Sequence, residues 1–71
     1  MILRRERFNN GEDIFLLLSS EDVVFRWDGS SRVLYKKFRD ESESIAVNSD
    51  KLFAESRAAG EEISREDYDR F

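Results

Sequence analysis

The chain has 71 residues and a formal net charge of −4, and it contains no His, Cys or Pro. These absences exclude a disulfide and a zinc site of the Cys/His type, and they remove the commonest general base and the strongest nucleophile of enzymes. Aromatic residues make up 13% of the chain, which is enough for a small hydrophobic core, so we expect one folded domain over residues 1–71.

The first part of the chain is typical of strands joined by turns. Residues 2–8 place charged side chains between apolar ones of the same parity, which predicts a charged edge strand. Asn10-Gly11 then predicts a hairpin turn, because both residues tolerate positive φ angles. The strand predicted at 14–19 contains the run Ile14–Leu18, which has no alternation. Such a run fits a central strand covered on both faces or a buried helix, and its short length favours the strand.

The clearest local signal is a hairpin centred on Asp28-Gly29. We predict its strands at 22–28 and 32–39. Trp27 shares the parity of the apolar residues in its strand, so it is expected to face the core, whereas Arg26 is expected on the opposite face.

The periodicity changes after a short strand predicted at 44–47. The pattern then predicts a helix over 49–59, capped by Asn48 or Ser49 and ended by Gly60 in a left-handed conformation. The core side of this helix is predicted to carry Leu52, Phe53, Ser56 and Ala59.

A second helix is predicted over 64–70. Ser64 begins a capping-box pattern, and Ile63 and Tyr68 have the spacing of a hydrophobic staple. The chain is therefore expected to fold as an α+β domain, a small antiparallel β-meander of four to five strands with one or two C-terminal helices packed on one face.

Catalytic and metal-binding functions find little support in the sequence. The serines of Ser30-Ser31 are explained by the turn, and acidic residues at a helix start are favoured by the helix dipole. The spacing of a calcium-binding loop is also absent. We therefore predict that the protein is not an enzyme and needs no cofactor and no metal ion.

Nucleic-acid binding is an alternative hypothesis. Aromatic and basic residues interleave on the predicted hairpin, as in sheets that bind single strands. The overall acidity opposes such binding, and an ordinary solvated face also explains the pattern. The candidate basic and aromatic patch consists of Arg26, Tyr35, Lys36, Lys37 and Arg39.

Protein binding is the function that the sequence favours. Residues 41–71 carry four basic residues against nine acidic ones, so the second part of the chain can present carboxylates to a basic groove of a partner. An ordinary solvated face remains the alternative. The candidate interaction surface consists of Glu61, Glu62, Glu66, Asp67 and Asp69.

In size, acidity and lack of catalytic residues the chain resembles small phage-encoded inhibitors of bacterial defence proteins, such as anti-CRISPR proteins. This likeness implies an inhibitor or adaptor that docks on a larger protein, encoded by a phage or mobile element. A homodimeric subunit is a further alternative, because so short a chain has a marginal core. The longest apolar run, Ile14–Leu18, is too short to span a membrane, so we expect a cytoplasmic protein.

Overall fold

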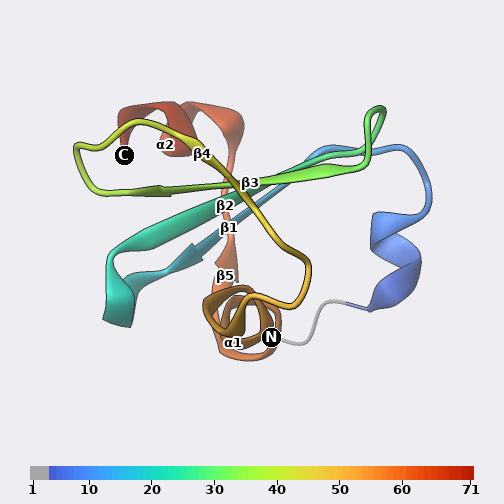
Figure 1. The fold of residues 1–71 in the computed structure, drawn as a ribbon, viewed down its shortest axis with the longest axis horizontal. Helices are drawn as coiled ribbons and strands as arrows, with labels where there is room; N and C mark the ends of the chain where they lie inside the picture. The colour runs from blue at the N-terminus through green and yellow to red at the C-terminus, as the bar shows by residue number, and fades with distance from the viewer. Residues whose placement is uncertain (1–3) are drawn as a thin grey trace.

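The computed structural model describes residues 4–71, and its centre is one five-stranded antiparallel sheet of order β4-β3-β2-β1-β5 (Figure 1). The strands are β1 Ile14–Leu18, β2 Val23–Asp28, β3 Val33–Phe38, β4 Ser44–Ala46 and β5 Glu61–Glu62. The helices are the 3-10 turns η1 Arg5–Phe8 and η2 Ser19–Glu21, and the α-helices α1 Lys51–Ala59 and α2 Arg65–Arg70. The α+β class and the antiparallel meander are confirmed.

The strand β1, which lies between β2 and β5, is covered on both faces, which explains its uninterrupted apolar run. Ile14, Leu16 and Leu18 belong to one buried cluster, whereas Phe15 and the partly buried Leu17 belong to another. Successive strand residues point to opposite faces, so the two clusters lie on the two sides of the sheet.

The two α-helices divide between these faces, and Figure 1 draws α1 and α2 on opposite sides of the sheet. Phe53 of α1 joins the cluster of Ile14, and Tyr68 of α2 joins the cluster of Phe15. The prediction placed the C-terminal helices on a single face of the sheet. This prediction is wrong for α1 and α2 taken together, because β5 lies between them at the edge of the sheet, where the chain crosses from one face to the other.

The α1 face holds the larger core. Phe25 is its largest fully buried side chain, and the centroids of the Phe25 and Phe53 rings are 5.4 Å apart. Trp27 is 6% exposed and lies on this face, as predicted. Phe8 of η1 packs edge-on against the rings of Trp27 and Phe53, with centroid distances of 5.7 and 5.8 Å.

The predicted edge strand over residues 2–8 is wrong for its described part. Arg5–Phe8 forms η1, while residues 1–3 lie outside the described part of the chain. Burial of the Phe8 ring against the end of the core outweighs strand formation, and the edge of β1 pairs with β5 instead. Gly11 does have a positive φ of 80°, but it links η1 to β1 and makes no hairpin.

The predicted hairpin around Asp28-Gly29 is present, but its turn is held by side-chain hydrogen bonds and not by a positive φ at Gly29. The Asp28 carboxylate accepts hydrogen bonds from the backbone N–H groups of Ser30 and Ser31, at 3.0 and 3.2 Å. The positive φ of the turn belongs to Arg32, at 59°. Gly29 is needed for space, because a Cβ atom there would lie 2.4 Å from the backbone oxygen of Glu12.

The first helix differs from its prediction at both ends. Asp50, rather than Asn48 or Ser49, is the N-cap, and it accepts from the N–H groups of Leu52 and Phe53. Gly60 ends the helix with φ −81° and is not left-handed. Ala59 is exposed, so it does not belong to the predicted core side.

A glycine is required at position 60 because the backbone there lies very close to the backbone of Leu17 and Ser56. A Cβ atom there would lie 2.5 Å from the backbone oxygen of Leu17 and 2.7 Å from that of Ser56. Only a glycine allows α1 and β5 to meet the sheet at this point.

The second helix follows its prediction closely. Ser64 Oγ accepts from the N–H of Asp67 at 3.1 Å, and Ile63 and Tyr68 lie in the same apolar cluster. The strands predicted at 14–19, 22–28, 32–39 and 44–47 agree with β1 to β4 within one residue at each end. Along residues 4–71, no helix has the length and apolar character that crossing a membrane requires.

Candidate protein-interaction surfaces

The candidate acidic surface lies on β5 and α2, and part of its charge is already neutralised. Glu62 accepts two hydrogen bonds from the guanidinium of Arg7, at 2.7 and 3.2 Å, and this carboxylate raises the pKa of Arg7. Asp67 accepts from Arg70 at 2.7 Å. Two of the five predicted carboxylates therefore serve internal ion pairs.

Three carboxylates of the acidic surface stay available. Glu61, Glu66 and Asp69 are exposed, and within residues 4–71 their side chains form no ion pair. In the same part of the chain, no three acidic side chains are placed to hold a metal ion.

The predicted basic and aromatic patch is split between the two faces of the sheet. Arg26 and Tyr35 are cross-strand neighbours on the α2 face, where the Arg26 guanidinium lies 4.1 Å from the centre of the Tyr35 ring. Lys36 points to the α1 face, where its Nζ binds Asp50 at 2.8 Å. This bond and the N–H groups of the helix start hold the pKa of Asp50 below its usual value.

The cations on the α2 face are also engaged within the molecule. Lys37 Nζ lies 4.9 Å from the centre of the Tyr68 ring. Arg39, just beyond β3, donates to Asp22 at 3.0 Å, and it lowers the pKa of that carboxyl. The cations of the patch are thus already engaged, which weakens the nucleic-acid hypothesis.

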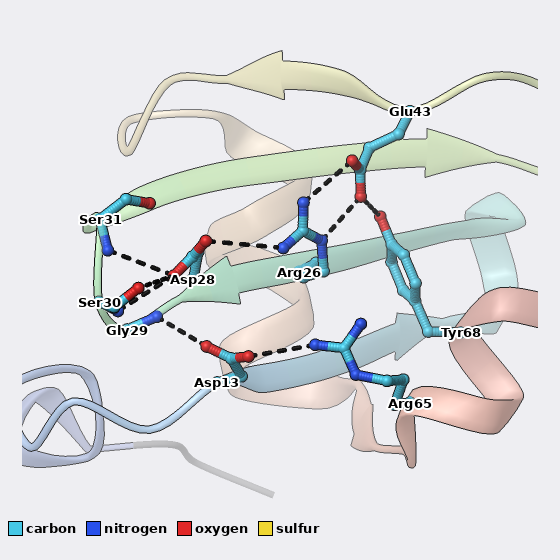
Figure 2. A network of polar contacts seen from close by, with 9 residues as sticks. All are labelled: Asp13, Arg26, Asp28, Gly29, Ser30, Ser31, Glu43, Arg65 and Tyr68. Atoms are coloured by element: carbon cyan, nitrogen blue, oxygen red, sulfur yellow. Dashed lines mark hydrogen bonds and ion pairs between the residues drawn. The ribbon is translucent and has the colours of Figure 1, made fainter.

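A polar network around Glu43 dominates the α2 face (Figure 2). Glu43 accepts from Arg26 Nε and Nη2 at 2.8 and 3.0 Å, and from the hydroxyl of Tyr68 at 2.5 Å. The Arg26 bonds hold the pKa of Glu43 below its usual range and raise that of Arg26. Burial and the bond to Glu43 raise the pKa of Tyr68.

The network continues along β1 and β2. Asp28 lies 3.9 Å from Arg26, and Asp13 accepts from the N–H of Gly29 at 2.9 Å and from Arg65 at 3.2 Å. Figure 2 shows these groups joining two strands, the β2–β3 turn and α2. They fix α2 on the sheet.

Exposed apolar side chains gather beside this network, at β4 and just after it. Ile45 is 73% exposed and is the cross-strand neighbour of Tyr35, and Val47 is 65% exposed. An apolar group ringed by polar side chains is typical of a protein contact surface. These two residues were not predicted as surface contacts, because they lie in the short strand predicted at 44–47, whose pattern does not show which side chains stay exposed.

A pocket opens on the α1 face, at the end of the sheet where η1 lies. Its volume is about 210 Å³, and its walls are the rings of Phe8, Trp27 and Phe53. Its polar lining comprises Asn9, Arg32, Asn48 and Arg57. This pocket could not be predicted from the sequence, because its residues come from five separate segments.

The comparisons with known proteins are consistent with each other. The Tis1 immunity protein family matches residues 1–70. The immune protein Tis1 of Pseudomonas aeruginosa strain UCBPP-PA14 is 34% identical over 59 residues, which are 80% of this chain and 77% of that protein. A chain in the crystal structure of the complex between the Type VI effector Tas1 and its immunity protein is 32% identical. It matches this fold with a TM-score of 0.88, over 97% of this chain and 92% of that chain.

Proposed function

Since the chain belongs to the Tis1 immunity protein family, we propose that it is a non-catalytic inhibitor that binds and neutralises a Type VI effector. The observation that carries this proposal is the likeness, over 97% of the chain, to a chain from an effector–immunity complex. Binding a larger protein was the function that the sequence favoured.

Several finer expectations gain no support from these relatives. They are described as immunity proteins, so the proposed phage or mobile-element origin is not supported. The homodimer has no support either, and the cytoplasmic location stays a prediction.

The size of the molecule limits how it can bind. A stable interface covers about 800 Å² on each partner, roughly a sixth of the 4583 Å² surface of the described chain. An interface of that size extends beyond any single patch. It brings together apolar side chains that are now exposed, such as Ile45, and charged groups without an internal partner, such as Glu61.

The acidic surface has a proposed part in this binding. Glu61, Glu66 and Asp69 are the carboxylates free to meet a basic region of the effector, and they would mainly speed association. Glu62 and Asp67 are held by Arg7 and Arg70 and contribute less.

The proposal is tested by neutralisation. The Tas1-like effector of the same host is produced in bacteria with and without the chain, and the purified pair is mixed for size-exclusion chromatography. We expect survival only with the chain, and one stable complex. A folded chain, checked by circular dichroism, that neither protects cells nor comigrates with the effector contradicts the proposal.

The acidic surface is tested in the same system. We expect the Glu61→Lys, Glu66→Lys and Asp69→Lys triple variant to associate more slowly at low salt, by about tenfold or more. The matched control, Glu6→Lys, Glu21→Lys and Asp40→Lys, makes the same charge change at exposed positions elsewhere. Equal association rates for the two variants remove the acidic surface from the interface.

A further inference from the structure

The pocket on the α1 face is a preformed recess. Phe8, Trp27 and Phe53 contact one another edge to face, so its aromatic walls are fixed by the core itself. Its volume of about 210 Å³ lies below the usual 300–1,000 Å³ of small-molecule sites. A recess of this size suits a single side chain.

The charge of the pocket is opposite to that of the protein. The chain has a net charge of −4, yet the pocket is lined by two guanidinium groups and two amides, and its described lining includes no Asp or Glu. A concave site with one sign of charge and apolar walls concentrates the field and attracts the opposite charge.

Arg32 is the cation that makes this pocket distinctive. Five other arginines form ion pairs, namely Arg7, Arg26, Arg39, Arg65 and Arg70. Arg32 forms none within residues 4–71, and its guanidinium donates to the side-chain oxygen of Asn9 at 3.2 Å. It lies 5.8 Å from the centre of the Trp27 ring.

The backbone holds Arg32 in a special conformation. Its φ of 59° is left-handed, and its N–H donates to the Asp28 carbonyl at 2.7 Å. A non-glycine residue in this region carries strain, and such residues cluster at functional sites. The turn therefore fixes the point from which the Arg32 side chain leaves the backbone.

A second observation points to an acceptor. The indole Nε1 of Trp27 is buried and has no hydrogen-bond partner within the described chain, although Trp27 forms a wall of the pocket. A buried donor without an acceptor is costly, and most buried donors in proteins have one.

We propose that this pocket receives a carboxylate side chain, Asp or Glu, from the surface of the effector. This inference rests on the proposed function and names an anchor point for it. The carboxylate pairs with Arg32, and its chain packs against the three rings. Arginine and aromatic residues in a desolvated recess are the usual composition of an interface hot spot.

The first experiment compares two variants that lose the same charge. Arg32→Gln removes the proposed partner of the carboxylate, and Arg39→Gln removes an exposed guanidinium that pairs with Asp22, outside the acidic surface. Calorimetric titration with the effector measures both, after circular dichroism shows both are folded. We expect Arg32→Gln to weaken binding by about ten- to a hundredfold, and Arg39→Gln to leave it within about twofold.

The second experiment uses the single Trp of the chain. With ¹⁵N-labelled chain and unlabelled effector, one indole N–H resonance reports on Trp27, and we expect it to shift on binding. The exposed Asp and Glu residues of the effector are then changed singly to Asn or Gln. With one of these effector variants, Arg32→Gln is expected to cause no further loss of affinity, because the change in the effector and the change in the chain remove the same ion pair.

The outcomes separate the two proposals. A complex in which the indole resonance stays unchanged, and Arg32→Gln binds like the control, overturns the pocket inference and leaves the proposed function intact. If the indole resonance shifts but no acidic residue of the effector is coupled to Arg32, another group fills the pocket. This result overturns the proposal that the pocket receives a carboxylate. Failure of the unaltered chain to bind or neutralise the effector contradicts the proposed function, and the pocket inference with it.

Discussion

The two faces of the sheet are built from the same strands but are held by different forces. Among residues 4–71, the α1 face buries nine apolar residues in one cluster, of which Phe25 is the largest fully buried side chain. In the same part of the chain the α2 face buries three, Phe15, Val24 and Tyr68, and completes its contacts with the polar groups around Glu43. The first face supplies most of the stability. The second uses charged groups, which orient α2 and leave β4 partly uncovered.

The largest expected effect comes from the α1 face. Phe25→Ala removes a ring that is 1% exposed, and it should lower the free energy of unfolding by about 3–5 kcal/mol. Phe15→Ala, on the α2 face, should cost less, because the ring borders the half-open cluster with Tyr68 and Arg65. Urea denaturation of both variants measures the difference, and equal losses would remove the distinction between the faces.

The crossover between the faces gives the second prediction. Gly60→Ala places a Cβ atom against the backbone of Leu17 and Ser56, and overpacking of this kind costs about 1–3 kcal/mol. Gly11→Ala is a comparison of a different kind, because its Cβ atom meets open space and its loss comes from the positive φ alone. Thermal unfolding measures both losses. A loss at Gly60 below about 0.5 kcal/mol would mean that the close approach carries no cost.

The polar network gives a pH-dependent prediction. Arg26 and Tyr68 hold the folded pKa of Glu43 below its ordinary value of 4.5, so its contribution is full above that pH and is lost as the pH falls through the folded pKa. Glu43→Gln should lower stability by about 1–3 kcal/mol at pH 7 and less at pH 3. Urea denaturation at both pH values measures the difference from the unaltered chain. A constant difference would contradict the network.

The two helix caps are expected to differ modestly. Asp50→Ala removes the acceptor of two backbone N–H groups and the Lys36 ion pair, whereas Ser64→Ala removes the acceptor of one N–H group at the short helix α2. Both losses fall in the range of about 0.5–2 kcal/mol, with Asp50 the larger. Thermal denaturation of each variant tests the order, and the reverse order would show that α2 depends more on its cap than on packing.

The smallest effect on stability is expected at β4. Ile45→Ser changes a side chain that is 73% exposed, so the free energy of unfolding should move by no more than about 0.5 kcal/mol. Binding to the effector should weaken if this end of the α2 face enters the interface. Denaturation and calorimetric titration on one sample separate the two effects. A variant that loses stability and keeps its affinity would assign Ile45 to the fold.

Local signals predicted the elements whose causes are local. The alternation around Trp27 placed its ring in the core, and the Ser64 cap with its staple located α2. The unbroken run Ile14–Leu18 correctly indicated two covered faces. The N-cap at Asp50 was missed by one or two residues, because several cap-forming residues stand in a row and only the tertiary contact with Lys36 favours one of them.

The candidate sites were predicted less well than the fold. Charge counting found Glu62 and Arg26 as surface residues but did not show that Arg7 and Glu43 neutralise them. Such pairs join residues that are distant in sequence, so no spacing rule reveals them. The pocket around Arg32 could not be predicted for the same reason, because its lining residues are also distant from one another in the sequence.

The sequence by itself determined the strand-rich first part, the hairpin at Asp28-Gly29, the capped C-terminal helices and the absence of His and Cys chemistry. Each follows from residue preferences that act over a few positions. Only the tertiary structure decided that η1 replaces an edge strand, that α1 and α2 take opposite faces, and which charges remain free. Those outcomes depend on which apolar surfaces meet after the chain has closed on itself. Burial of Phe8 and the close approach at Gly60 are set there by long-range packing and not by neighbours in the sequence.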